Sequence, residues 1–221
     1  MNTHPFKKAD SALTLIEVLV VLAVVGVLVA ALLTWASGAR ARSIRMCCVN
    51  SLKQTGLAFQ VWSGDNHGDF PMGIPETNGG TKEFITGPNA YRHFQVVSNE
   101  LTTLYTVICA ADIRSERMAT NFTYLNNSNI SFFIGVDAHP TNGSRILAGD
   151  RNLTNGMSAH DAILDVTAKN PSGWTAELHG GVGNVLLSDS SVQQVSVAGL
   201  RETIAMTGLA TNSLQMPVTI P

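Results

Sequence analysis

Residues 11–33 read SALTLIEVLVVLAVVGVLVAALL, and the sixteen residues from Val18 to Leu33 carry no polar side chain. The apolar segment as a whole covers residues 13–35. As a helix it would be about 35 Å long, enough to cross a bilayer core that is about 30 Å thick. The segment therefore predicts one membrane-spanning helix close to the N-terminus.

A cleaved secretory signal peptide and a plain membrane anchor are the two rival interpretations. A signal peptide has an apolar core of about 7–15 residues with a small-residue cleavage site after it. Here the core is longer, and the small residue Ala12 precedes it. A plain anchor does not explain Glu17, because an acidic side chain inside a membrane span is costly and marks a functional position. A free α-amino group at Leu13, created by cleavage after Ala12, would give Glu17 a partner on a neighbouring subunit.

The segment resembles the prepilin signature of type IV pilins and type II secretion pseudopilins. In that family a prepilin peptidase cuts ahead of the apolar helix and methylates the new N-terminus, and a glutamate is the fifth residue of the mature chain. A cut between Ala12 and Leu13 places Glu17 fifth and makes Leu13 the methylated residue. The family usually has Gly before the cut and Phe after it. Ala12 is still small and Leu13 still apolar, so we expect cleavage.

Helical periodicity continues beyond the apolar segment. Apolar residues recur at three- and four-residue steps at Met46, Val49, Leu52, Gly56 and Phe59, which predicts one stripe of an amphipathic helix. Gly, Asp, Asn and Pro then gather and end the helix. The expected division of the chain is a leader (1–12), a transmembrane or fibre-core helix (13–35), its amphipathic continuation (36–63) and a β-rich globular domain (64–221).

Short runs with strand character, separated by Gly, Asn, Pro or Asp, follow the helix. They cover residues 94–97, 104–109, 130–136, 145–148, 184–187 and 192–197. We predict a short helix over residues 198–209 and a polar tail from there to Pro221. The simplest arrangement is an α+β fold, with a small antiparallel sheet packed on one long helix. The resemblance implies the same type IV pilin-like fold.

The resemblance extends to the body of the chain. Residues 48–71, CVNSLKQTGLAFQVWSGDNHGDFP, resemble the helix end of pilin-like proteins common in Planctomycetes and Verrucomicrobia, which also carry a His, nine residues and Asp-Gly. Residues 179–196, HGGVGNVLLSDSSVQQVS, match that motif through His179 and Asp189, with Ser190 in place of Gly. The block predicts a hairpin whose turn favours glycine. We therefore expect another turn type or local strain at Ser190.

The motif residues have a structural and a chemical interpretation. His179 and Asp189 could form a metal or acid–base pair, but we favour a structural role, in which His179 caps a loop and Asp189 bonds turn amides. Some pseudopilins hold a structural calcium ion. Asp65, Asp69 and Asp189 are the candidate calcium ligands here, although GDNHGD (residues 64–69) is not an EF-hand loop. No other cofactor is expected.

Three cysteines allow at most one intrachain disulfide. Cys48 is on the predicted helix and Cys109 closes a predicted strand. A bridge between them would tie the helix to the sheet, and outside the cytosol such a bridge is permitted. Two free buried thiols are the open alternative. Cys47 is spare in either case.

Composition and motifs restrict the function classes. The 221-residue chain has a net charge of −2 and only 14% charged residues, so it has no electrostatic basis for nucleic-acid binding. The nucleophile-elbow, zincin, Walker A and dinucleotide-binding motifs do not occur. We therefore expect a structural subunit rather than an enzyme.

The resemblance implies a pseudopilin or minor pilin of a type II secretion or type IV pilus-like fibre. Its partners would be the prepilin peptidase, other pilin-like subunits, and the inner membrane with its secretion or pilus platform. Two alternatives stay open: a fibre-borne or membrane-tethered module that binds DNA, glycan or a surface, and an uncleaved single-pass anchored domain. Flanking Lys and Arg residues slightly favour the reverse orientation, but the resemblance implies a cytoplasmic leader and an extracytoplasmic body.

Overall fold

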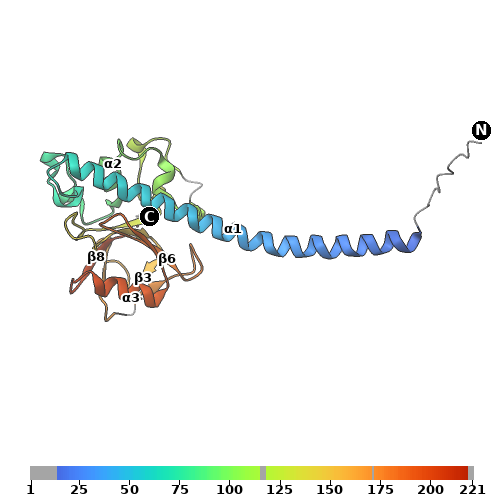
Figure 1. The fold of residues 1–221 in the computed structure, drawn as a ribbon. Coiled ribbons are helices and arrows are strands. Elements are labelled where there is room, and N and C mark those ends of the chain that lie inside the picture. Colours follow the sequence, from blue (N-terminus) through green and yellow to red (C-terminus); the bar gives the residue numbers. More distant parts are fainter. Residues whose placement is uncertain (1–13, 115–117, 171, 219–221) are drawn as a thin grey trace, which may run out of the picture. The chain divides into compact units, whose positions relative to one another are not determined.

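The computed structural model describes residues 14–114, 118–170 and 172–218. It divides into two compact units, residues 1–43 and residues 44–221. Helix α1 (Leu15–Asp65) begins in the first unit and ends in the second (Figure 1). The second unit begins at Ile44, so it contains the last turns of α1 together with the chain after the helix.

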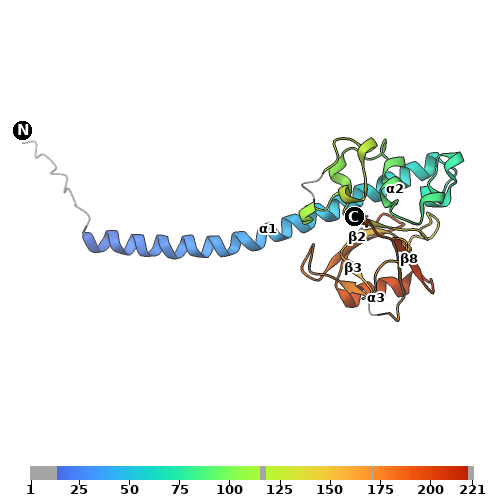
Figure 2. The same cartoon turned by 180° about the vertical axis from the view of Figure 1, so that it is seen from behind.

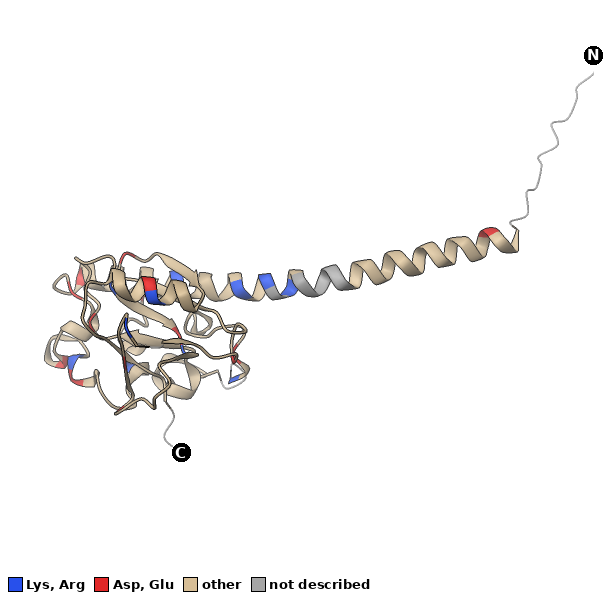
Figure 3. Cartoon of the chain, turned by 90° about the horizontal axis from the view of Figure 1, so that it is seen from below, with Lys and Arg blue, Asp and Glu red and all other residues tan. Residues whose placement is uncertain are grey.

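The first unit contributes an apolar helical segment. Residues Leu15–Leu33 have a mean hydropathy of 3.0, and among the described residues they form one helix long and apolar enough to cross a membrane. Their side chains are all exposed. Glu17 is the single charged residue along this segment (Figure 3). An apolar surface of this kind requires lipid or other apolar helices around it.

The second unit is built on an antiparallel sheet with the strand order β4-β8-β1-β2-β6-β7. A separate pair of short strands, β3 and β5, lies beside it. The α+β arrangement of an apolar N-terminal helix followed by an antiparallel sheet is thereby confirmed. The strand bounds are β1 Phe132–Gly135, β2 Ile146–Asp150, β3 Leu153–Thr154, β4 Ile163–Val166, β5 Gly173–Trp174, β6 Gly183–Leu187, β7 Val192–Val195 and β8 Asn212–Gln215.

The sheet separates two hydrophobic cores because successive strand residues point to opposite faces. Phe132 and Ile134 of β1 join the core that contains α1 residues, whereas Phe133 joins the core of helix α3 (Val197–Met206). In β6, Leu186 faces the α1 side, and its two neighbours in the strand face the α3 side. Within the second unit, α1 and α3 therefore cover opposite faces of the sheet, as the two opposed views in Figures 1 and 2 show.

The second-unit part of α1 buries one side against the sheet. Cys48, Leu52 and Phe59 are fully buried, and the Phe59 ring makes edge-to-face contacts with Phe70 and Phe94. The prediction of a buried helical stripe is confirmed at Leu52, Gly56 and Phe59 but is wrong for Met46, which is 59% exposed. Cys48 takes the first buried position of the stripe instead.

The chain between α1 and β1 contains no strand among its described residues. Residues 94–97, predicted as a strand, lie mostly in the short helix α2 (Ala90–Val96), and residues 104–109 contain a 3-10 helix rather than a strand. Both strand predictions are wrong, because the apolar residues here are buried from helical turns, Phe94 from α2 and Val107 from η4, in the core that contains α1 residues. The 3-10 helices here are η1 Pro71–Gly73, η2 Glu76–Asn78, η3 Lys82–Phe84, η4 Leu104–Val107, η6 Phe122–Tyr124 and η7 Asn127–Asn129.

The four remaining strand predictions are confirmed as β1, β2, β6 and β7, and the short C-terminal helix as α3. The predicted polar tail is wrong, because β8 (Asn212–Gln215) lies inside the sheet between β4 and β1. Gln215, the buried polar residue at the end of β8, donates hydrogen bonds from its side-chain amide to the carbonyl oxygens of Phe84 and Gly87. Its amide oxygen is hydrogen-bonded to the ring of His93. Burial lowers the pKa of His93 to about 4, so this ring is neutral inside the core.

Candidate functional site

The first candidate site is the start of the apolar helix, where Thr14 and Glu17 bond each other reciprocally. The Glu17 backbone N–H lies 3.4 Å from Thr14 Oγ1, which accepts its hydrogen bond. In return, Glu17 Oε2 accepts hydrogen bonds from the backbone N–H and the hydroxyl of Thr14, each 2.8 Å long. This is a capping box with Thr14 as N-cap and Glu17 at the third helical position. The predicted cleavage residues, Ala12 and Leu13, lie outside the described residues.

The capping box explains why a carboxylate is tolerated at this position. The first backbone N–H groups of a helix have no partner within it, and the helix dipole favours negative charge at that end. Glu17 therefore has a partner inside its own subunit in addition to the amine expected from a neighbour. Sequence reasoning missed Thr14, although the Thr-x-x-Glu pattern ahead of an apolar run is the signal that identifies such a cap.

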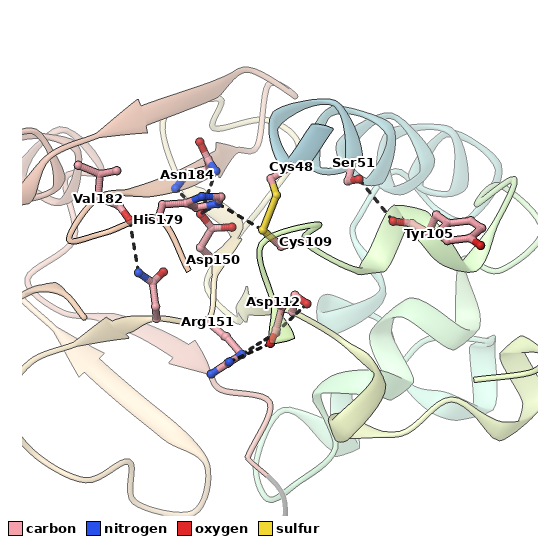
Figure 4. The surroundings of a disulfide bond; sticks show 12 residues. Cys48, Ser51, Tyr105, Cys109, Asp112, Asp150, Arg151, His179, Val182 and Asn184 are labelled. Carbon is pink, nitrogen blue, oxygen red and sulfur yellow. Dashed lines mark hydrogen bonds and ion pairs between the residues drawn. A yellow bond between two sulfur atoms is a disulfide. The ribbon is translucent and has the colours of Figure 1, made fainter. Parts of the chain in front are cut away.

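The second candidate site is a buried cluster around a disulfide between Cys48 of α1 and Cys109, which follows η4 (Figure 4). Both cysteines are fully buried, and their Cα atoms are 4.8 Å apart. Thr55, also on α1, donates a hydrogen bond of 3.0 Å to the carbonyl oxygen of Thr106. The disulfide and this hydrogen bond attach η4 and the residues after it to the helix. Cys47, the next residue along the helix, is exposed and free.

His179 lies against this disulfide and not against Asp189. Its Nε2 atom is 3.2 Å from Cys109 Sγ and 3.4 Å from Asp150 Oδ2, and these three side chains point toward one another in Figure 4. Burial, together with the positive charge of Arg45, lowers the pKa of His179. The structure therefore separates the two motif residues, and it brings His179 to a carboxylate that the sequence did not suggest.

Asp150, at the end of β2, is a fully buried acid. Its Oδ2 atom accepts hydrogen bonds from the backbone N–H and the side-chain amide of Asn184, at 2.7 and 2.9 Å. Within the described part of the chain, its Oδ1 atom has no hydrogen-bond partner. Burial raises the pKa of Asp150 to about 7, against the opposing effect of the Asn184 hydrogen bonds. The shifts of Asp150 and His179 both favour a neutral pair over an ion pair.

Asp189 and Ser190 form the turn of the β6–β7 hairpin. Asp189 Oδ1 accepts a hydrogen bond of 2.8 Å from the backbone N–H of Ser191. Ser190 has a φ of +66°, so it occupies the left-handed region in which a side chain is strained. The turn therefore keeps the backbone that glycine would favour, and Ser190 carries the local strain anticipated above.

A second buried acid, Asp112, lies in a network that sequence reasoning missed. Arg151 donates to both its carboxylate oxygens, from Nε at 2.7 Å and from Nη2 at 2.9 Å, and Arg114 adds a contact at 3.2 Å. Although burial opposes its charge, the hydrogen bonds from the two arginines hold the pKa of Asp112 well below its usual range. Arg151 also contacts the exposed Glu177. The network is charge-paired and structural.

The candidate calcium ligands are distributed over separate features. Asp65 is the last residue of α1, and Asp189 is in the hairpin turn. Asp69 Oδ1 accepts a hydrogen bond from the backbone N–H of Phe70 and lies 3.7 Å from the ring of His139. Within residues 14–114, 118–170 and 172–218, the one group of three ligand side chains close enough to hold a metal ion is Cys48, Cys109 and His179.

Comparison with known proteins identifies the N-terminal segment. Residues 7–33 match the family model described as the prokaryotic N-terminal methylation motif. With the apolar helix, this match supports a membrane-anchored, type IV pilin-like prepilin that a peptidase processes and that assembles with other pilin subunits. It ends at Leu33 and so does not test the resemblance in the body of the chain. No curated protein and no solved structure matches the chain.

Proposed function

We propose that this chain is a structural subunit, a pseudopilin or minor pilin, of a type II secretion or type IV pilus-like fibre. The observation that carries the proposal is the coincidence of the methylation motif at residues 7–33 with an exposed apolar helix and an acidic residue at its start. In this proposal the leader is cytoplasmic, and residues 44–221 are extracytoplasmic.

Processing prepares the subunit for assembly. Prepilin peptidase cuts between Ala12 and Leu13 and methylates the Leu13 amine. The apolar helix then keeps the subunit in the inner membrane until assembly. Moving it from lipid into a bundle of similar helices exchanges one apolar environment for another, so packing and polar contacts rather than the hydrophobic effect select the partner.

Glu17 supplies the polar contact that sets the position of one helix against the next. A carboxylate and an amine that meet in an apolar core attract each other strongly, and leaving either unpaired there is costly. In this proposal Thr14 donates hydrogen bonds to the Glu17 carboxylate before assembly. In the fibre, the Leu13 amine of a neighbouring subunit pairs with the Glu17 carboxylate. The register between helices follows from that pairing.

Intact mass and N-terminal sequencing of the protein from native membranes test the proposal. A chain beginning at N-methyl-Leu13, recovered also in sheared surface fibres, is the expected result. A chain beginning at Met1 in membranes that process their other prepilins would overturn it and favour the uncleaved anchor. A processed chain that is absent from every fibre fraction would contradict the role in a fibre.

A further inference from the structure

We propose that Cys48, Cys109, His179 and Asp150 form a zinc site when the disulfide is reduced. The two sulfur atoms and a ring nitrogen of His179 all lie within 4.8 Å of one another. All three residues are buried, and they come from three separate segments: helix α1, the chain after η4, and the loop before β6. This inference is independent of the proposed function.

The ligand types suit zinc. Zn²⁺ binds thiolate sulfur and imidazole nitrogen in tetrahedral sites closed by four protein ligands. Calcium and magnesium take oxygen ligands, so a pair of sulfurs with one nitrogen selects against them. Two thiolates balance the charge of the ion. The Asp150 carboxylate adds one negative charge, which is stable in a buried position only beside a cation, and the positive charge of Arg45 acts on the same His179 ring.

Asp150 is a second, independent observation that points to a cation at this position. Its side chain is fully buried, and its Oδ1 atom accepts no hydrogen bond from any described residue. Its Oδ2 atom lies 3.4 Å from the same His179 nitrogen that contacts Cys109. Asp150 is not part of the group whose ligand atoms all lie within 4.8 Å of one another, so in this proposal its carboxylate moves toward the ion to become the fourth ligand. Asn184 bonds Oδ2 through two N–H groups and orients the carboxylate, as outer hydrogen bonds do at metal sites.

Disulfide and zinc are alternative states of one site. In the oxidised state each sulfur is bonded to the other and cannot act as a thiolate ligand. The newly made chain carries both thiols, and a dithiol reductant restores them by giving two electrons and two protons to the disulfide while it becomes a disulfide itself. Zinc binding then releases the two thiol protons, and also the proton of Asp150 where its carboxyl group is protonated. Oxidation of the thiols by a disulfide-forming oxidant ends zinc binding.

Cys47 provides a matched control, because it is adjacent in sequence but points elsewhere. Successive residues of a helix are rotated by about 100°. Cys48 is consequently buried in the cluster, whereas Cys47 is exposed and makes no disulfide. A nonspecific effect of thiols on zinc uptake would involve the accessible Cys47 at least as strongly as the buried pair.

The test uses the full chain in detergent micelles, purified without a histidine tag. A phosphine reduces the disulfide and takes oxygen from water, and the protein is then titrated anaerobically with Zn²⁺ alone against a chromogenic zinc chelator. We expect one zinc per reduced chain and none per oxidised chain. With Co²⁺, thiolate charge-transfer and tetrahedral d–d bands should appear. The Cys47→Ser chain should behave like the wild type, and His179→Gln should bind at least about tenfold more weakly.

Several outcomes would overturn the inference. One is that the reduced chain takes up no zinc in the micromolar range, whether near-ultraviolet circular dichroism shows it to be folded or unfolded. The Cys48→Ser/Cys109→Ser double variant could still bind one zinc ion. Two further refuting results are loss of zinc binding in the Cys47→Ser chain and unchanged zinc affinity in the His179→Gln chain. Alkylation adds a direct readout, because bound zinc should protect two thiols in the wild type and leave Cys47 reactive.

Discussion

Thr14 and Glu17 satisfy each other's hydrogen-bonding groups at the first turn of α1, with Glu17 Oε2 accepting both the backbone N–H and the hydroxyl of Thr14. The carboxylate therefore has two uses that variants can separate. One is a cap within the subunit, which needs an acceptor oxygen. The other is the proposed pairing with an amine of a neighbour, which needs a negative charge.

Glu17→Gln keeps an acceptor oxygen and removes the charge. We expect normal membrane insertion but at least about tenfold less protein in sheared fibres, because removing one partner of a buried ion pair costs about 3–5 kcal/mol. Glu17→Val should assemble as poorly or worse. Thr14→Val is the control that loses the hydroxyl and keeps the charge, so it should assemble better than either. Immunoblots of fibre and membrane fractions measure the ratio, and normal incorporation of Glu17→Gln would refute the charge pairing.

The Cys48–Cys109 disulfide should contribute substantially to stability. The two cysteines are 61 residues apart. A cross-link that closes a loop of that length lowers the conformational entropy of the unfolded chain and so stabilises the folded state by about 4 kcal/mol. We expect Cys48→Ala/Cys109→Ala to lose about this amount in denaturant unfolding of the full chain in detergent. The buried Trp62 and Trp174 report the transition by fluorescence. Cys47→Ser is the control and should change stability by less than about 0.5 kcal/mol.

Asp150 should make the domain less stable as the pH rises. Its pKa in the folded state is about 7, against 3.8 for an ordinary aspartate. Between these values the folded chain holds a proton that the unfolded chain has lost, so the unfolding free energy decreases from about pH 4 to about pH 7. Asp150→Asn removes this slope. The stability of the variant relative to the wild type should therefore increase across that range, and a constant difference would contradict the raised pKa.

Other buried groups do not obscure this comparison. The lowered pKa of His93 produces the opposite slope, because its unfolded form takes up a proton between about pH 6.5 and pH 4. Wild type and Asp150→Asn share that contribution, so it cancels in their difference. His179, which contacts Asp150 directly, is tested by repeating the comparison in a His179→Gln background.

Ser190→Gly should stabilise the hairpin. Ser190 holds a φ of +66°, which costs a side-chain-bearing residue about 1–2 kcal/mol, and its buried hydroxyl has no hydrogen-bond partner among the described residues. Glycine removes both costs at the expense of unfolded-chain entropy, so we expect a gain of about 1 kcal/mol in unfolding free energy. Ser188→Gly is the matched control, since Ser188 is buried in the same turn without a positive φ, and it should destabilise the domain.

The apolar helix could be recognised from local sequence, because an uninterrupted run of apolar residues specifies both a helix and its surroundings without reference to any distant residue. The same holds for β1, β2, β6 and β7, whose β-branched and aromatic residues lie between strong turn residues. Glu17 was identifiable for a related reason: a single acid inside an apolar run is exceptional wherever the chain folds.

Only the tertiary structure assigned roles to the polar residues that are buried. Nothing near Asn212–Gln215 in sequence predicts a strand, since its partners β4 and β1 and the His93 ring come from distant segments. His179 likewise acquired Asp150 and the disulfide as neighbours instead of Asp189. A buried polar group is stable only if its hydrogen bonds are satisfied. The groups that satisfy them are brought together by packing on both faces of the sheet. No local sequence pattern encodes that packing.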